Sequence, residues 1–79
     1  MQSRLTAEAN PPGATITFNG DPRRVPHGCT MQALLESLGM TARHVAVELN
    51  LEVVPRGRHG ETLLAPGDSV EVVSLVGGG

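Results

Sequence analysis

The alternation of hydrophobic and polar residues near the start of the chain predicts a β-hairpin. Ile16 and Phe18 fall on one face of an extended segment, and the threonines beside them fall on the other. Asn19-Gly20 follows directly, and this pair favours a type I′ turn because both central positions of that turn need positive φ. We expect a return strand over residues 21–25, at a sheet edge, because Pro22 has no N–H to donate to a second neighbour.

The hydrophobic spacing then changes to the period of a helix. The apolar stripe consists of Met31, Leu34, Leu35 and Leu38. Thr30 precedes the stripe, where its hydroxyl can accept a hydrogen bond from a first-turn N–H, and Gly39 follows it, where a left-handed residue can end the helix. A helix this short is not stable alone, so it must pack on a sheet.

Three further strands are predicted in the second half of the chain. Residues 45–49 are almost continuously apolar, which indicates an interior strand, and residues 52–54 form a short strand. A polar segment with two glycines, residues 56–62, is expected to be a loop or a single short turn of helix. Ala65-Pro66-Gly67-Asp68 is typical of a tight turn, and the last strand covers residues 69–76.

The last strand has a different character on each face. Val70 and Val72 point to one side, whereas Val73 and Leu75 point to the other. If the first side meets the helix, Val73 and Leu75 are apolar side chains that face outward beside the C-terminal residues. We therefore predict that Val73, Leu75 and Val76 form a docking patch for a partner protein, since interface cores favour apolar side chains.

The order of these elements predicts an α+β fold of the β-grasp (ubiquitin-like) type. One main helix packs on one face of a mixed sheet of four to five strands and leaves the other face open. The first and last strands of this fold pair in parallel at the centre of the sheet, so the C-terminal residues extend beyond it. We expect residues 1–14 to be a disordered leader, residues 15–76 to form the domain and residues 77–79 to be a flexible tail.

The sequence ends Val76-Gly77-Gly78-Gly79. A run of three glycines stabilises neither a strand nor a helix, because glycine gives up more backbone freedom on ordering than any other residue. The run leaves the Gly79 carboxylate, ionised at neutral pH, on a stem that can enter a channel too narrow for a Cβ atom. Glycines are also tolerated in frayed chain ends, so the tail alone does not decide between these two interpretations.

Composition narrows the functional class. A chain of 79 residues is one small domain, with little room for a deep enclosed active site. A single aromatic residue, Phe18, and a net charge of -2 argue against nucleic-acid binding. No segment is apolar for long enough to span a membrane, residues 1–15 lack the apolar core of a signal peptide, and the single cysteine fits a reducing compartment. We therefore expect a cytoplasmic protein that binds neither nucleic acid nor membrane.

Other candidate residues have ordinary explanations beside the functional ones. Cys29 lies near a helix N-terminus, a setting that can lower a thiol pKa, but a lone cysteine is more often a core or loop residue. The three histidines fall in separate loops without metal-ligand spacing, so we expect no metal site. Glu48 and Glu71 fall on predicted strands and could be taken for a carboxylate pair, but solvated strand positions explain them better. Arg56 and Arg58 fit an exposed loop, although they could also contact a partner or the phosphates of ATP.

Several segments together resemble the ThiS family, the sulfur carriers of thiamine biosynthesis. The resemblance covers the chain apart from the leader and depends on the order of the segments, since no single motif is specific. Leu51 departs from the family pattern, because family members often carry a small turn residue there, and the leader is longer than usual. The segments that carry the resemblance are residues 15–20, 31–38, 45–50, 53–56, 66–68, 70–73 and 76–79.

The resemblance implies a sulfur carrier that is not an enzyme and has no cofactor of its own. A ThiF-like adenylating enzyme would join the Gly79 carboxylate to AMP from ATP, and sulfur from a cysteine-persulfide donor would then displace the AMP. The resulting thiocarboxylate would pass its sulfur to thiazole synthase (ThiG), with Gly77 and Gly78 as the tail that reaches into the partners.

Alternatives to this function remain. The small subunit of molybdopterin synthase uses the same C-terminal activation, and so does a ubiquitin-like protein modifier, in which Gly79 would be joined to a lysine of a target protein. An RNA-binding β-grasp module belongs to a different class. It predicts a basic face and needs no terminal glycines, which does not fit this chain.

Overall fold

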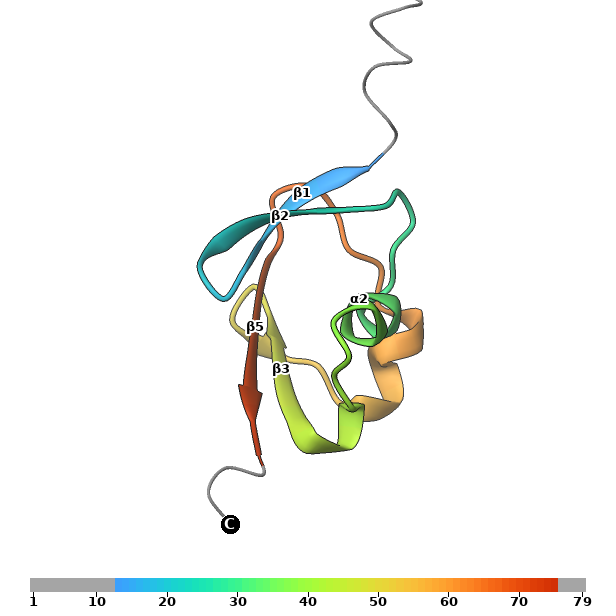
Figure 1. Ribbon diagram of the computed structural model, residues 1–79, viewed down its shortest axis with the longest axis vertical. Helices are drawn as coiled ribbons and strands as arrows, with labels where there is room; N and C mark the ends of the chain where they lie inside the picture. Colours follow the sequence, from blue (N-terminus) through green and yellow to red (C-terminus); the bar gives the residue numbers. More distant parts are fainter. Residues whose placement is uncertain (1–12, 76–79) are drawn as a thin grey trace, which may run out of the picture.

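The computed structural model describes residues 13–75, which form one mixed sheet with helical segments on one of its faces (Figure 1). The sheet has five strands in the order β2-β1-β5-β3-β4. β1 and β5 are parallel, and the other neighbouring pairs are antiparallel. The elements are β1 (Ala14–Phe18), β2 (Asp21–Val25), α2 (Met31–Ser37), the 3₁₀ helix η1 (Ala42–His44), β3 (Val45–Leu49), β4 (Glu52–Val53), the 3₁₀ helix η2 (Arg56–Glu61) and β5 (Ser69–Ser74).

This architecture is the predicted β-grasp. The last strand, β5, lies in the centre of the sheet between β1 and β3 and runs parallel to β1, as the element order predicts. α2 and η2 lie on one side of the sheet, and β5 ends at the opposite end of the molecule from the start of β1 (Figure 1). None of the helices in the described part of the chain is long and apolar enough to cross a membrane.

The β1–β2 hairpin turns at Asn19-Gly20, as predicted. The φ angles of these two residues are 50° and 90°, the positive values that a type I′ turn needs. The strand that carries Pro22, β2, lies at the sheet edge. The Asn19 side chain accepts a hydrogen bond from the Val72 N–H at 2.8 Å and donates one to the Val72 carbonyl oxygen at 3.3 Å. Asn19 therefore continues the hydrogen bonding of β5 where β1 turns away.

α2 begins and ends at its predicted capping residues. The hydroxyl of Thr30 accepts a hydrogen bond from the Ala33 N–H at 3.1 Å. At the other end Gly39 has a φ of 73°, and the Met40 N–H donates to the Leu35 carbonyl oxygen at 2.9 Å. The helix ends at Ser37, one residue before the predicted end, because Leu38 already serves as its C-cap.

The hydrophobic core lies between α2 and the sheet. The apolar stripe of α2 supplies one side of it, and Val70 and Val72 of β5 are buried on the other side, as their pattern predicts. Burying a large aliphatic side chain contributes about 1.5–3 kcal/mol, so α2 is held by packing and not by its own helix propensity. The buried core residues are Ala14, Ile16, Val25, Cys29, Met31, Leu34, Leu35, Val47, Leu64, Val70 and Val72.

Strand boundaries differ from the predictions by one or two residues. β1 begins at Ala14, one residue early, because Ala14 is buried and pairs with Val25 across the hairpin. β4 ends at Val53, one residue before the predicted end, although the Val54 N–H still donates to the Val47 carbonyl oxygen of β3 at 2.9 Å. β5 ends at Ser74. Residues 1–12 of the predicted leader and residues 76–79 lie outside the described part of the chain.

The turn between β3 and β4 contains a backbone strain that a substitution can test. Leu51 has a φ of 73° and is 85% exposed, so its side chain gains little from burial while its Cβ is crowded. We expect Leu51→Gly to raise the free energy of unfolding by about 0.5–1 kcal/mol, the strain relieved less the entropy cost of glycine. Leu51→Ala keeps the Cβ and serves as the control. Chemical denaturation checks both, and an equal gain from alanine would show that strain is not the cause.

Candidate functional site

The point at which β5 leaves the sheet is fixed by hydrogen bonds. The Leu75 N–H donates to the carbonyl oxygen of His44 in η1 at 2.8 Å, and Ser74 pairs with Val45 in the β3–β5 register. η1 lies at the same end of the molecule as the end of β5 (Figure 1). Leu75, the last described residue, is therefore held against η1 by a backbone hydrogen bond. The predicted adenylation site, Gly79, and the predicted tail residues Gly77 and Gly78 lie outside the described residues, and so does Val76, the third residue of the predicted docking patch.

The sheet face opposite α2 carries exposed apolar side chains, two of them at the end of β5. Val73 and Leu75 are 60% and 62% exposed, and Val53 on the neighbouring edge is 71% exposed. Val70 and Val72 of β5 are buried while Val73 and, just after the strand, Leu75 are exposed, which is the division between two faces that the alternation predicts. We call this surface the open face, and it consists of Ala46, Glu48, Val53, Glu71, Val73 and Leu75.

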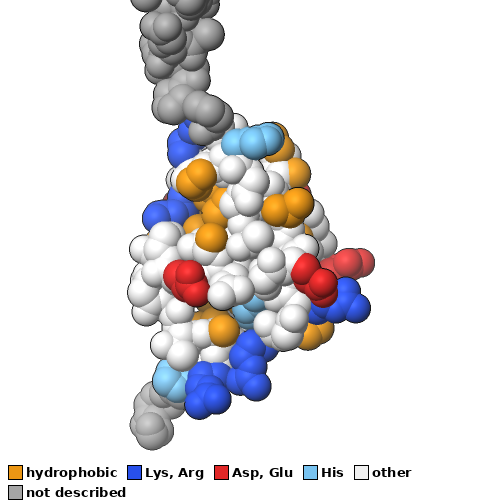
Figure 2. Space-filling model, turned by 90° about the vertical axis from the view of Figure 1, so that its right-hand side faces the viewer, with side chains coloured by type: hydrophobic (Ala, Val, Ile, Leu, Met, Phe, Trp, Pro, Cys, Tyr) orange, Lys and Arg blue, Asp and Glu red, His pale blue; other side chains and the backbone are white. Residues whose placement is uncertain are grey.

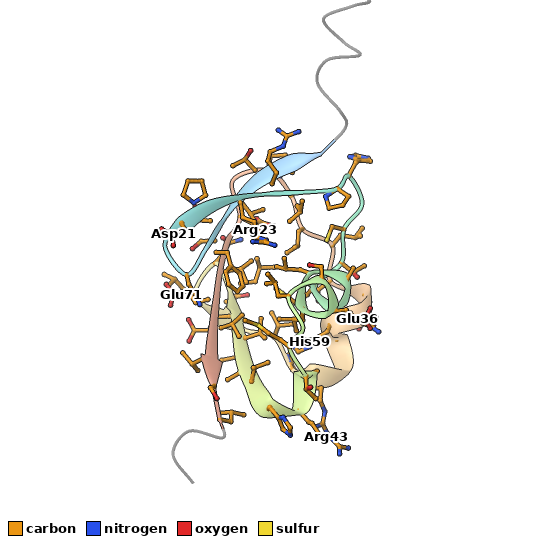
Figure 3. All side chains as sticks on the ribbon, in the orientation of Figure 1. Asp21, Arg23, Glu36, Arg43, His59 and Glu71 are labelled. Carbon is orange, nitrogen blue, oxygen red and sulfur yellow. The ribbon has the colours of Figure 1, made fainter. Side chains whose placement is uncertain are left out.

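Two carboxylates lie side by side in the middle of the open face. Glu48 of β3 and Glu71 of β5 are directly opposite each other in the antiparallel register. Figure 3 shows the Glu71 side chain pointing away from α2. The sequence alone places each residue on a strand, but it does not reveal that they are neighbours, because the register joins segments that are far apart in the chain.

A pocket of about 410 Å³ lies on the helix side, between α2, the segment that follows it and η2. Figure 2 shows this side, with arginine side chains near its lower end. Arg56 lines the pocket, whereas Arg58 forms an ion pair with Glu61 at 3.1 Å. η2 contributes Arg56 and His59 to the lining of the pocket, and it is longer than the loop or single short turn of helix that the sequence predicts. Since Val73 lies on the opposite sheet face, the pocket is separate from the open face.

The histidines do not form a common site. His27 lies in the loop before α2, His44 in η1 and His59 in η2, where His59 is 4% exposed. The His59 Nε2 atom is 3.2 Å from the Val54 carbonyl oxygen, and it carries the hydrogen because a carbonyl oxygen can only accept. Within residues 13–75, no group of three His, Cys, Asp or Glu side chains is placed to hold a metal ion.

Cys29 is a core residue in this structure. Its side chain is buried, and its thiol lies 3.4 Å from the Thr30 carbonyl oxygen, to which it donates a weak hydrogen bond. Burial raises the pKa of the Cys29 thiol, which is the opposite of the shift that a helix N-terminus can produce. Because the thiolate is the reactive form, the structure favours the packing role that the sequence left as one of two interpretations.

Known proteins show the same architecture and much of the same sequence. The model of the ThiS family matches residues 16–79. The chain is 39% identical over 64 residues to the sulfur carrier protein ThiS of Thermus thermophilus, covering 81% of this chain and 98% of that protein. It is 41% identical over 64 residues to a thiazole synthase of Paramagnetospirillum magneticum, where the match covers 81% of this chain but only 20% of that protein. The crystal structure of the thiamine biosynthesis protein ThiS from Geobacter metallireducens superimposes with a TM-score of 0.71 at 37% identity, covering 82% of this chain and 99% of that one.

Proposed function

This chain belongs to the ThiS family of sulfur carriers in thiamine biosynthesis, and we propose that its sulfur is carried as a thiocarboxylate on Gly79. Members of this family are carriers and not catalysts. The observation that supports the proposal is the position of β5. The strand lies at the centre of the sheet and is held at Leu75, and the sequence continues from there into Val76 and three glycines.

The proposed chemistry follows from the reactivity of a carboxylate. A carboxylate does not react with sulfur nucleophiles until one of its oxygens becomes a leaving group. An adenylating partner of the ThiF type supplies that group when the Gly79 carboxylate attacks the α-phosphorus of ATP and releases pyrophosphate. A persulfide sulfur then attacks the carbonyl carbon and AMP leaves, after which a thiol cleaves the sulfur–sulfur bond and frees the thiocarboxylate.

Thiazole synthase is the proposed acceptor of the sulfur. Support comes from the thiazole synthase of Paramagnetospirillum magneticum, in which one fifth of the protein matches this chain. That match shows a segment like this domain within a protein of that name, which favours the thiamine branch over molybdopterin synthase. We propose that this domain delivers its sulfur to a thiazole synthase, with Gly77 and Gly78 passing through the entrance to the active site of that enzyme.

A reconstituted reaction tests the proposed acceptor. The full chain is incubated with ATP, the cognate adenylating enzyme, a persulfide donor, a thiol and thiazole synthase, together with the substrates that supply the carbon and nitrogen atoms of the ring, and thiazole formation is measured. We expect one thiazole for each thiocarboxylate consumed and none when the carrier is omitted. If thiocarboxylate forms but yields no thiazole with a synthase of proven activity, the proposed acceptor is wrong. Transfer to a molybdopterin precursor, or a new bond to a lysine of another protein, would instead support one of the alternative functions.

The exposed apolar residues of the open face are proposed to dock the adenylating enzyme. Val73→Glu places a charge where an apolar contact is expected, so we predict an affinity for this enzyme at least about tenfold lower, while the fold is unchanged because Val73 is exposed. Leu63→Glu is the matched control, since Leu63 is 64% exposed and lies outside the open face. Titration calorimetry measures both variants, and circular dichroism confirms their folding. Equal affinity for Val73→Glu and the parent would remove Val73 from the docking surface.

A further inference from the structure

The paired carboxylates of the open face are in an unfavourable arrangement. Residues directly opposite in an antiparallel pair have Cβ atoms about 4.5–5.5 Å apart, and like charges there destabilise the sheet. Glu48 and Glu71 are such a pair, on neighbouring strands in the middle of the sheet. Neither carboxylate has a hydrogen bond or an ion pair with another residue of the described part of the chain. The free domain therefore carries a repulsion that its own described side chains do not neutralise.

The surroundings of the pair add apolar surface. Val53 pairs with Glu48 on its outer side, and Ala46 and Val73 form the next row of the sheet toward the exit of β5. Alternation along β2 places Arg24 on the open face as well. Arg24 is nevertheless separated from Glu71, because β1 lies between β2 and β5. The open face thus presents two adjacent negative charges with the exposed side chains of Val53 and Val73 next to them, on a sheet whose central strand ends just before Leu75, the last described residue.

We propose that the open face docks on the adenylating enzyme by receiving a basic side chain, arginine or lysine, between Glu48 and Glu71. The proposal rests on the function proposed above. An enzyme that binds ATP holds the negative triphosphate with basic groups, so the surface around its active-site entrance is suited to acidic residues beside the incoming tail. In the complex, the basic side chain neutralises the repulsion, while Val53 and Val73 make the apolar contacts that exclude water from the ion pair.

This arrangement has a signature that a purely structural role does not produce. Glu71→Gln keeps the size of the side chain and removes one of the two repelling charges. The free domain is then expected to unfold at an equal or higher temperature than the parent, while its affinity for the adenylating enzyme falls about tenfold. The affinity of the parent is expected to weaken as salt is raised, and the affinity of the variant is expected to depend less on salt. Glu48→Gln is expected to have the same effects.

Glu52→Gln is the control, because Glu52 pairs with Leu49 and alternation places it on the helix side of the sheet. Binding of the full chain is measured by titration calorimetry without ATP, so it does not depend on the chemistry at Gly79. The proposal is overturned if Glu71→Gln and Glu48→Gln bind the adenylating enzyme with the affinity and salt dependence of the parent. It is also overturned if these variants lose affinity for thiazole synthase but not for the adenylating enzyme. If the variants lose affinity but the parent forms no thiocarboxylate when ATP and sulfur are supplied, the docking proposal stands and the proposed function fails.

Discussion

Deletion of Gly79 is expected to abolish adenylation of this protein. The deletion moves the terminal carboxylate back by one residue, about 3.3–3.6 Å along an extended chain. A displacement of only 1 Å can cost about 10²-fold in rate, so we expect the rate of adenylation to fall by at least about 10³-fold. The rate of adenylation is measured as the release of pyrophosphate in the presence of the adenylating enzyme and ATP.

Two further variants separate reach from other effects of the deletion. Gly79→Ala keeps the length of the chain but adds a Cβ beside the reacting carbon, so it should react more slowly than the parent and faster than the deletion. Removal of residues 2–12 changes the other end of the chain and should leave the rate unchanged. A deletion variant that releases pyrophosphate at the parent rate would show that the position of Gly79 does not matter.

Leu34→Ala is expected to have the largest effect on stability. Leu34 is buried in the middle of the apolar stripe of α2, against the sheet. Truncating a buried leucine to alanine costs about 2–5 kcal/mol, and a domain of this size is stabilised by only about 5 kcal/mol or somewhat more. We therefore expect the variant to lose a large part of its free energy of unfolding and to unfold at a much lower urea concentration than the parent. Urea denaturation followed by circular dichroism measures the loss.

Leu63→Ala is the matched control for this effect. Leu63 is 64% exposed, so the same change in side chain should alter the free energy of unfolding by less than about 0.5 kcal/mol. If the two substitutions cost the same, the core is not located between α2 and the sheet as described.

The fold could be predicted from the sequence because its decisive signals are local. Asn19-Gly20 specifies the first turn, and Thr30 and Gly39 bound the helix, through backbone preferences that act within a few residues. The alternation in β5 places Val70 and Val73 on opposite faces for the same reason, since side chains of a strand point alternately to each side. These features follow from neighbouring residues and need no knowledge of the rest of the chain.

The features that the sequence did not reveal depend on contacts between distant segments. The pairing of Glu48 with Glu71 follows from the register of β3 against β5, and the bond from Leu75 to His44 follows from where η1 meets the end of β5. The side-chain amide of Asn19 forms hydrogen bonds with the backbone of Val72 in the place of a neighbouring strand, and turn preferences do not predict these bonds. The pocket beside Arg56 is likewise formed by elements that pack together only in the folded domain.

Intact-mass analysis shows directly whether Gly79 is the residue that carries the sulfur. The full chain is incubated with ATP, the adenylating enzyme and a persulfide donor, and its mass is compared with that of the untreated protein, followed by fragmentation to locate the change. We expect a gain equal to the exchange of one oxygen for one sulfur, confined to Gly79 and absent without ATP. An unchanged mass with an adenylating enzyme that is active on another carrier, or a sulfur located on Cys29, would contradict the claim that Gly79 carries the sulfur.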